Sequence, residues 1–506
     1  MLHIPKTYYV KTFGCQMNVS DSERIATFLE AQGFLECGEI KDANLVIFNT
    51  CGVKQTAENR AYSLINNLRK TEKASHLKTK TYLPTGQAGK PKTIILTGCL
   101  ANRADVQKRM QNKVDLFCEI KNFPEAVASI LYNVSGINSK IHNTSYNIPH
   151  TKNPYDKEDL DYLSIQPKHQ NSFEAYVPIM TGCNNFCAYC VVPNARGREV
   201  SRPAEEIITE VKDLVARGYK NIILLGQNVN SYQSPISIAS SPSQGEDVRY
   251  SGQMRLSTGT DESAGCDFPT LLKKINSIPG KFWIQFVSSH PKDMSDELIE
   301  AMTKCKKVCE AIHLPVQAGD DEILRRMNRR YTQKHYLTLI KKINLAFKKN
   351  KPEKLFSISS DIIVGFPGET RQQFLQSASL MEKSKFDMVF FGQFSPRPET
   401  AAWKMKDNVS QKEKARREKY LNEILKKTAL ENNQKYLSKI VEVLIEKKAP
   451  KAKPSDEGLA FGNLAYFGKT RTLKNVKVTT SKKDLLGKIV KVKIIKANVW
   501  NLEGEF

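Results

Sequence analysis

The sequence predicts a multidomain α/β protein with an N-terminal parallel α/β sheet domain, a central partial (β/α)6 barrel and a small C-terminal β-barrel. At 506 residues the chain is too long for one hydrophobic core, and its hydrophobic content of 40% suffices for packed domains. Short β-rich runs alternate with helical stretches over most of the chain, which is typical of parallel sheets. After residue 436 alternating strands return without helices between them, as in a small barrel.

The N-terminal domain is expected over residues 1–133, where strand and helix patterns alternate. Strands joined by helices run parallel, so their carboxyl ends should meet at one edge of the sheet, where open α/β sheets bind ligands. The strands are expected at Tyr8–Phe13, Leu45–Asn49 and Thr93–Thr97, and the helices at Asp21–Gln32 and Thr56–Lys70.

Three segments lack the hydrophobic periodicity of helices and strands. Residues 73–92 are expected to form an inserted surface loop, because their Gly89-Lys90 lacks both the spacing and the following Ser or Thr of a phosphate loop. Residues 134–171 are rich in Asn, Ser, Lys, His and Pro, which indicates a linker. Residues 233–263 are polar, low-complexity sequence typical of a disordered insert.

A second β/α series is expected over residues 172–405. Its six strand patterns with intervening helices predict a partial (β/α) barrel, and such barrels place their chemistry at the carboxyl ends of the strands. The strands are expected at Ala175–Met180, Ile222–Leu225, Trp283–Val287, Ile312–Leu314, Ile358–Val364 and Met388–Phe394.

The last part of the chain combines a connecting helix over residues 406–435 with a β-barrel over residues 436–506. The barrel segment carries 15 Lys and Arg against 7 Asp and Glu, a net charge of +8. Its strands are expected at Val441–Ile445, Leu459–Tyr466, Lys474–Thr479 and Ile489–Lys496.

The charge of the whole chain points to a polyanionic partner. Lys and Arg number 77 against 53 Asp and Glu, which gives a net charge of +24 and favours nucleic acid over a merely solvated basic surface. No signal pattern begins the sequence and no apolar run reaches membrane-spanning length, so a cytoplasmic protein without a membrane partner is expected. In that compartment 11 cysteines indicate metal or redox ligation rather than disulfides.

Cys183, Cys187 and Cys190 form a Cys-x3-Cys-x2-Cys run with Tyr189 before the last cysteine. Three thiolates this close can bind three irons of a four-iron cluster and leave the fourth iron open to another ligand. The run lacks the paired Cys-x2-Cys or the histidines of a structural zinc site. Three structural cysteines are the alternative, but the spacing favours a cluster.

Cys15, Cys51 and Cys99 share another context, because each follows an expected parallel strand by one or two residues. All three should therefore lie at the carboxyl edge of one sheet. A small hydrophobic role would explain any one of them, but it explains three in the same position poorly. Three thiolates again predict a cluster with one open iron.

Taken together, these features resemble the methylthiotransferase family of radical S-adenosylmethionine (SAM) enzymes over nearly the whole chain outside the inserts. The resemblance includes the N-terminal three-cysteine domain, the radical SAM core and a C-terminal TRAM-type RNA-binding barrel. A family Ser-Gly is Ala318-Gly319 here, and the two inserts lack a family counterpart. Further matching runs are Leu225-Gly-Gln-Asn-Val-Asn-Ser-Tyr232, Ser288-Ser-His-Pro291, His313-Leu-Pro-Val-Gln-Ala-Gly319 and Gly365-Phe-Pro-Gly-Glu-Thr370.

The resemblance implies two [4Fe-4S] clusters and SAM as cofactors. The contexts of Cys15 and His290 look like the 2-methylthio-N6-dimethylallyladenosine synthase branch, which adds a methylthio group to C2 of N6-isopentenyladenosine beside the anticodon of tRNA. In that family one SAM methylates a sulfur on the first cluster, and a second SAM yields the radical that attacks the adenine. An unactivated aromatic C–H needs such cofactor chemistry, because no acid–base pair removes its proton under mild conditions.

Several residues at strand ends are candidates for SAM contact. Gly365 and Gly368 would let the backbone approach a ligand, and Thr370 can cap the following helix. His290 before Pro291 is either a turn histidine or a group that faces the substrate. The full set of SAM candidates is Tyr189, Gly226, Gln227, Gln317, Gly365, Gly368 and Glu369.

The C-terminal barrel is expected to bind tRNA through Lys469, Arg471, Lys474 and Lys477, which cluster in sequence beside Tyr466 and Phe467. Lysines can neutralise phosphates while rings stack on bases. The alternative is a solubilising domain whose lysines face only water. Further expected partners are a flavodoxin- or ferredoxin-type electron donor and iron–sulfur assembly proteins.

Two other functions stay open at the level of sequence. One is a sister methylthiotransferase that acts on threonylcarbamoyl-adenosine in tRNA or on a ribosomal-protein aspartate. The other is a non-catalytic iron–sulfur protein that binds RNA or senses redox state. Cys305 and Cys309 are interpreted as packing cysteines despite their Cys-x3-Cys spacing, and Cys37, Cys118 and Cys266 are isolated.

Overall fold

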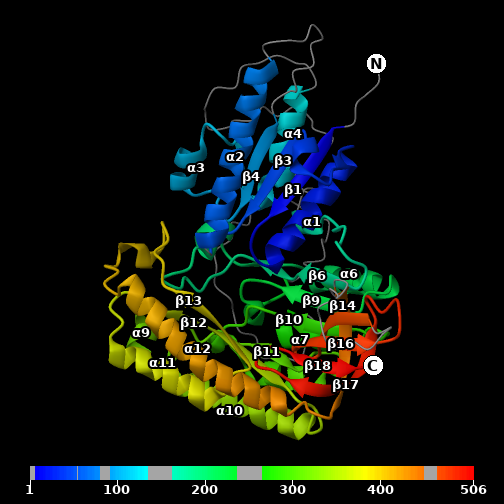
Figure 1. The fold of residues 1–506 in the computed structure, drawn as a ribbon, viewed down its shortest axis with the longest axis vertical. Helices are drawn as coiled ribbons and strands as arrows, with labels where there is room; N and C mark the ends of the chain where they lie inside the picture. Colours follow the sequence, from blue (N-terminus) through cyan, green and yellow to red (C-terminus); the bar gives the residue numbers. More distant parts are fainter. Residues whose placement is uncertain (1–5, 54, 80–91, 135–161, 236–264, 450–463) are drawn as a thin grey trace, which may run out of the picture.

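The structure is a computed structural model that describes residues 6–53, 55–79, 92–134, 162–235, 265–449 and 464–506. Figure 1 shows the N-terminal sheet domain, in blue, above a half-open barrel in green and yellow. The C-terminal strands, in red and orange, lie beside that half-barrel at the end away from the N-terminal domain. The three-part α/β architecture expected from the sequence is confirmed.

The N-terminal domain is a five-stranded, all-parallel sheet in the order β2-β1-β3-β4-β5. The central strand β3 is buried along its whole length, because helices cover both faces of the sheet. The elements are β1 (Thr7–Thr12), α1 (Gln16–Ala31), β2 (Leu35–Glu36), β3 (Leu45–Thr50), α2 (Gln55–Thr79), β4 (Thr93–Gly98), α3 (Ala104–Met110), β5 (Leu116–Phe117) and α4 (Phe123–Val134).

Two helix boundaries differ from the expected ones. Helix α1 begins at Gln16 rather than at Asp21, because its polar first turns are buried between domains instead of lying in a solvated loop. Helix α2 continues to Thr79, so residues 73–79 of the expected surface loop are helical. Residues 80–91 lie outside the described part of the chain. Arg69 stabilises the long α2, because its guanidinium donates a hydrogen bond to Glu72 in the next turn of the helix.

The central domain contains six parallel strands in two three-stranded sheets, β6-β9-β10 and β11-β12-β13. A single parallel bridge between Ile284 and Val308 joins the two sheets, so the strands form one half-barrel, as expected. The strands are β6 (Glu174–Pro178), β9 (Asn221–Leu225), β10 (Trp283–Phe286), β11 (Ala311–His313), β12 (Ser357–Val364) and β13 (Met388–Gln393). The helices are α5 (Val192–Arg196), α6 (Ala204–Ala216), α7 (Phe268–Ser277), α8 (Asp296–Lys304), α9 (Asp321–Arg326), α10 (Gln333–Asn350) and α11 (Arg371–Ser384).

The expected linker is packed in its last part. Tyr162 and Leu163 are buried in the core of the N-terminal domain, and the side chain of His169 is 1% exposed beside Glu23. This end of the linker is ordered although its composition is polar on average, because its apolar side chains are buried and its polar side chains are paired. Residues 135–161, and residues 236–263 of the second expected insert, lie outside the described part of the chain.

Helix α12 (Gln411–Gln434) leads from the half-barrel to a closed barrel in the order β14-β15-β16-β18-β17. It packs on α11 and β13 (Figure 1). None of the described helices is both long and apolar enough to cross a lipid bilayer. The barrel strands are β14 (Ile440–Lys448), β15 (Leu464–Thr470), β16 (Asn475–Thr480), β17 (Ile489–Ala497) and β18 (Leu502–Glu505), the last of which is too short and polar to be expected from sequence.

Candidate active site

The structure brings Cys15, Cys51 and Cys99 together at the carboxyl edge of the N-terminal sheet. Cys15 is the residue before α1, and the other two follow β3 and β4 directly. The backbone N–H of Cys99 donates to the carbonyl of Thr50 at 2.9 Å. A Cβ atom placed on Gly14 would lie 2.7 Å from the Cβ of Cys51. The three strand ends therefore place these cysteines side by side, and we call them the first triad.

Asn18 holds the loops of the first triad in place, a role that the sequence reasoning missed. Its Oδ1 accepts from the Cys15 thiol at 3.3 Å, and its Nδ2 donates to the Thr50 carbonyl at 2.9 Å. The side chain of Asn49 completes the buried network by donating to the Asn18 carbonyl at 2.8 Å. Asn18 is 1% exposed. The only signal in sequence was its position three residues after a candidate ligand.

The second triad, Cys183, Cys187 and Cys190, lies on one loop above the half-barrel. The loop begins at Gly182, which has a φ of 77° and whose added Cβ would lie 1.9 Å from the Arg198 carbonyl oxygen. The backbone N–H of Cys190 donates to the carbonyl of Cys187 at 2.9 Å. Only glycine fits the start of this loop without a backbone shift.

Arg329 is a second residue that sequence reasoning missed, because no motif marks it. Its Nη1 donates to the sulfur of Cys187 at 3.4 Å, and its Nη2 donates to the Pro315 carbonyl at 2.8 Å. Arg329 is 6% exposed, so it brings a buried positive charge to the second triad. Burial raises the pKa of the Cys190 thiol to about 12, so a thiolate there needs the compensating charge of a metal.

The hydrogen-bond donors around the second triad fit an iron–sulfur cluster. Among the described residues, no group of three or more His, Cys, Asp or Glu side chains is placed to hold one metal ion. A cluster takes each thiolate on a different iron, so its ligands stand farther apart than those of one ion. The sulfurs of the second triad also receive N–H donors, from Asn185 at 3.5 Å and from the Val192 backbone at 3.5 Å. Such donors tune clusters.

The two triads face the same interface between the domains. A Cβ atom on Gly52, beside Cys51, would lie 3.3 Å from the Cβ of Cys99 and 3.3 Å from the Val191 side chain, beside Cys190. A small cavity at this place is lined by Cys99 and Val191 together with Asn194. Groups held by the two triads would therefore meet across one short boundary.

Buried ion pairs fix this interface on both sides of the triads. Asp21 of α1 pairs with Arg196 of α5 at 2.6 Å, and the two side chains are 1% and 4% exposed. The pair ties the helix that begins after Cys15 to the helix that follows Cys190. On the other side Arg397, after β13, lies 3.5 Å from the buried carboxylate of Glu58 on α2, and it donates to the Val53 carbonyl at 3.0 Å.

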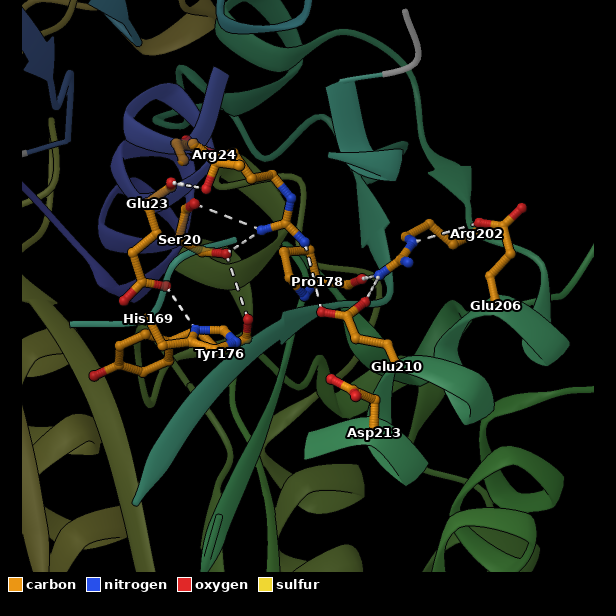
Figure 2. Close-up of polar contacts among 12 residues, drawn as sticks. Ser20, Glu23, Arg24, His169, Tyr176, Pro178, Arg202, Glu206, Glu210 and Asp213 are labelled. Carbon is orange, nitrogen blue, oxygen red and sulfur yellow. Dashed lines mark hydrogen bonds and ion pairs between the residues drawn. The ribbon is translucent and has the colours of Figure 1, made fainter. Parts of the chain in front are cut away.

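Figure 2 shows a further buried polar layer between α1 and the half-barrel. Arg24 donates to the Ser20 hydroxyl at 2.6 Å and lies 3.8 Å from Glu210. Arg202 reaches the same carboxylate from the opposite side at 2.8 Å. Glu23 lies 2.9 Å from the ring of His169. These charges are matched across the boundary, so the two domains are docked in one orientation.

The Gly-Phe-Pro-Gly-Glu-Thr run forms the expected strand–turn–helix join, but its contacts are internal. A Cβ atom on Gly365 would lie 2.4 Å from the Lys414 side chain, and one on Gly368 would lie 2.7 Å from Arg326. Glu369 accepts from Arg417 at 2.6 Å and from the Gly365 N–H at 2.8 Å. These contacts give the run a structural role, and SAM contact by Gly365, Gly368 and Glu369 stays a prediction.

The ends of β9 and β10 contain buried polar atoms without a partner among the described residues. They include the side-chain oxygens of Gln227, Asn228, Asn230 and Ser289. Buried polar groups are nearly always satisfied, so these atoms are available to accept from a ligand or an ordered water. The segment is linked to the loop of the second triad through Glu199, which accepts from Ser231 at 2.8 Å and whose backbone N–H donates to Asn184 at 3.2 Å.

The remaining SAM candidates also lie near the second triad. A Cβ atom on Gly226 would lie 2.6 Å from the Met180 side chain, so this glycine allows close packing below the triad loop. Gln317 has a φ of 68°, a strained conformation that clusters at functional sites. Tyr189 is partly buried against the core of the half-barrel, and desolvation raises its pKa well above the ordinary value. His290 is 5% exposed, with its pKa lowered to about 2 by burial, so it stays neutral.

Two of the expected RNA-binding residues serve another purpose. Arg471 pairs with Glu310 at 2.7 Å, and Lys474 pairs with Asp387 at 2.7 Å; their side chains are 12% and 10% exposed. Both pairs join the small barrel to the half-barrel. Their acidic partners, Glu310 and Asp387, directly precede β11 and β13 at the amino ends of those strands. The expectation that Arg471 and Lys474 face phosphates therefore needs correction.

The other two candidates lie on the outer face of the small barrel. Phe467 is 38% exposed and sits opposite Lys447 on β14 and Lys477 on β16. Lys469 lies two residues along the same face and is 41% exposed in its side chain, 3.3 Å from Glu446. We call Lys447, Phe467, Lys469 and Lys477 the basic face. Tyr466 points into the barrel core instead.

Cys305 and Cys309 are packing cysteines, as expected. Both are buried, Cys309 against Trp283 and Leu444, and burial raises its pKa to about 12. Cys37 and Cys118 are isolated in the N-terminal domain, where Cys118 joins the hydrophobic core.

The fold and the site define a radical SAM enzyme with an additional three-cysteine domain. Residues 177–381 match the family described as Radical SAM superfamily. Residues 7–119 match the family described as Uncharacterized protein family UPF0004. Among solved structures, the chain is similar to a radical S-adenosylmethionine methyltransferase from Kitasatospora setae, with 13% identity, coverage of 79% of this chain and 77% of that chain, and a TM-score of 0.46.

The chain belongs to the family of tRNA-2-methylthio-N(6)-dimethylallyladenosine synthases. It is 37% identical to the enzyme of that name from Carboxydothermus hydrogenoformans over 99% of both chains. It is 38% identical to the one from Clostridium botulinum over 98% of this chain and 96% of the relative. Both matches extend through all three parts of the chain.

Proposed function

We propose that this protein is a radical SAM methylthiotransferase that adds a methylthio group to C2 of N6-isopentenyladenosine next to the anticodon of tRNA. One observation carries the proposal: two three-cysteine sets open onto one interdomain boundary, where Gly52 and Val191 nearly touch. A non-catalytic iron–sulfur protein would not need two sets so placed. The family membership supports this reaction over those of the sister methylthiotransferases.

In this proposal the chain's residues hold and separate two sets of ligands. Cys15, Cys51 and Cys99 bind one [4Fe-4S] cluster, and the second triad binds the other. When bound, these clusters and SAM supply the sulfur, the methyl group and the electron for radical chemistry. The Asp21–Arg196 pair keeps the two sites at a fixed separation.

SAM is proposed to bind beside the second triad at the ends of β9 and β10. The unpartnered amide oxygens of Gln227, Asn228 and Asn230 are acceptors that suit an ammonium or amino group. Gln317 and Tyr189 border the same place in the proposal. Gly226 keeps the floor of this site flat, because a side chain there would meet Met180.

The proposed partners follow from the reaction and the charge. The basic face of the C-terminal barrel is proposed to bind tRNA phosphates, with Phe467 available to stack on a base. A flavodoxin- or ferredoxin-type electron donor and iron–sulfur assembly proteins are further proposed partners. With tRNA as the substrate, the proposed location is the cytoplasm.

The test is anaerobic reconstitution with iron and sulfide, followed by incubation with SAM, a reductant and tRNA. Mass spectrometry of the digested tRNA should detect 2-methylthio-N6-isopentenyladenosine. A matched tRNA without the isopentenyl group should yield no methylthio product. A methylthio group on threonylcarbamoyl-adenosine instead would replace the proposed substrate with that of a sister enzyme.

A further inference from the structure

The inner face of strands β11 to β13 carries side chains that the reaction described so far does not use. Along β12, Ile358, Ser360 and Ile362 are buried, whereas the alternate side chains, Asp361 among them, are partly exposed. On β13, Phe390 is 58% exposed. Alternate residues of a strand point to opposite faces, so these groups share the face away from the packed core.

The exposed groups form one contiguous surface. Asp361 pairs in register with Phe390, and Ile363 pairs with Gly392. From β11, the His313 ring reaches Ser359 at 3.0 Å through Nδ1 and Asp361 at 3.4 Å through Nε2. The same ring stands edge-on to Phe390 at 6.0 Å between centroids. We call His313, Ser359, Asp361, Phe390 and Gly392 the inner-barrel surface.

The inner-barrel surface has room above it. A Cβ atom on Gly392 would meet no heavy atom within 4 Å. By contrast, the inner face of β9 on the opposite side of the barrel is covered, because Met17 of α1 packs on Ile223 and Leu225. The N-terminal domain therefore covers one half of the barrel interior and leaves the half around Phe390 open.

The inner-barrel surface lies below the second triad. Asp361 precedes Val364, the last residue of β12, by three positions, which is about 10 Å along a strand. The second triad and the unpartnered amide oxygens lie at the carboxyl ends of the same barrel. A planar ligand on Phe390 would thus have one edge directed at the site where SAM is proposed to bind.

We propose that the inner-barrel surface binds the N6-substituted adenine of the substrate, an inference that rests on the proposed function. Phe390 stacks on the purine ring, and Asp361 accepts a hydrogen bond from N6–H. The space beside Gly392 takes the N6 substituent. His313, held by Ser359, orients the carboxylate of Asp361.

The chemistry of these groups matches such a base. Single-stranded loops of RNA are recognised by splaying a base onto an aromatic side chain and reading its edge. An adenine with one N6 substituent keeps one N–H donor for the Asp361 carboxylate. Guanine and uracil present a carbonyl oxygen at the equivalent position, whose lone pairs would oppose a carboxylate. The Asp361 side chain is 37% exposed, so a ligand can reach it.

The test measures RNA binding without turnover. Reconstituted enzyme with SAM and no reductant is titrated into a fluorescent anticodon stem-loop that carries N6-isopentenyladenosine, and into the same RNA with plain adenosine. Phe390→Ala should weaken binding of the isopentenylated RNA roughly 10-fold or more, and Phe390→Tyr should restore it. Gly392→Leu should remove the preference for the isopentenylated RNA.

Tyr420→Ala is the matched control, because Tyr420 is a 50% exposed aromatic on α12 outside the barrel. Its affinity should equal that of the wild type. An iron content and a denaturant midpoint equal to those of the wild type should show that each variant is folded. A wild type that prefers the isopentenylated RNA, while Phe390→Ala keeps its affinity for that RNA and Gly392→Leu keeps the preference, would overturn the inner-barrel assignment alone. A wild type without the preference would overturn the proposed substrate as well.

Discussion

The two triads reach the same number of thiolates by opposite routes. The first is gathered by topology, since three parallel strands far apart in sequence end beside one another. The second is gathered by one loop over residues 183–190, which starts at Gly182 and is held from outside by Arg329 and by the Met327 carbonyl. The first triad therefore depends on the fold of a whole domain, and the second on a short segment.

The polar support of the two triads differs in charge. Cys15 is held by the neutral amide of Asn18, whereas Cys187 faces the guanidinium of Arg329. A buried positive charge favours the electron-rich state of a cluster, so the second triad is the better site for accepting an electron. The difference suggests a division of labour: the second triad handles the electron and the first holds the transferred group.

The largest expected effect separates the roles of the two triads, holding the transferred group and accepting the electron. Cys51→Ala should lower methylthio product by more than roughly 100-fold, since even residues behind metal ligands cost about 10- to 100-fold. It should leave reductive cleavage of SAM to 5′-deoxyadenosine intact. Cys187→Ala should lose both. Product and 5′-deoxyadenosine are measured together by mass spectrometry.

Cys305→Ala is the control for these two variants, because it removes a buried thiol without touching either triad. It should retain both activities. A folded Cys51→Ala protein that no longer cleaves SAM would mean that the two triads do not have separate roles.

The next effect concerns the buried Asp21–Arg196 ion pair, which joins the helices that follow Cys15 and Cys190. Asp21→Asn leaves Arg196 buried without its counter-charge, and breaking a buried pair costs about 3–5 kcal/mol of unfolding free energy. Asp296→Asn breaks the exposed pair with Lys342 and should cost less than about 1 kcal/mol. Denaturant midpoints of the two variants give the comparison. Equal denaturant midpoints for the two variants would show that the Asp21–Arg196 pair does not stabilise the interface.

A smaller effect distinguishes the triads through their glycines. An added Cβ on Gly98 would lie 2.5 Å from the Thr50 carbonyl oxygen, and one on Gly182 would lie 1.9 Å from that of Arg198. Both positions have positive φ, so alanine costs about 1–3 kcal/mol in local strain. Gly98→Ala should weaken iron retention at the first triad only, and Gly182→Ala at the second only. Iron analysis during chelator challenge measures the loss, and loss from both sites in either variant would argue against independent loops.

The sequence predicted the second triad from spacing and the first from its strand-end positions. It could not predict the Asp21–Arg196 and Glu58–Arg397 ion pairs, because these are ordinary polar residues until the domains dock. Arg471 shows the opposite error, since its basic neighbourhood favoured RNA while its partner, Glu310, lies in another domain. Which charged residues form ion pairs across distant segments depends on the tertiary fold, and local composition does not predict it.

The smallest expected effect lies far from both triads, on the basic face of the C-terminal barrel. Changing Lys447, Lys469 and Lys477 to Gln should weaken tRNA binding and reduce the salt slope by up to about 3 log units per log of salt, roughly one per lost phosphate contact. SAM cleavage without tRNA should not change. Lys491 and Lys493 on β17, changed to Gln, are the matched control on the same barrel. A salt slope that both sets lower equally would show that charge alone, not this face, binds the RNA.

The central claim is that two separate four-iron clusters sit on the two triads, and iron content tests it most directly. Reconstituted protein should contain about eight irons per chain. Changing Cys183, Cys187 and Cys190 together to Ala should leave about four, and so should changing Cys15, Cys51 and Cys99 together. A triple variant that keeps the full complement, or one that loses all of it while folded, would contradict two independent clusters.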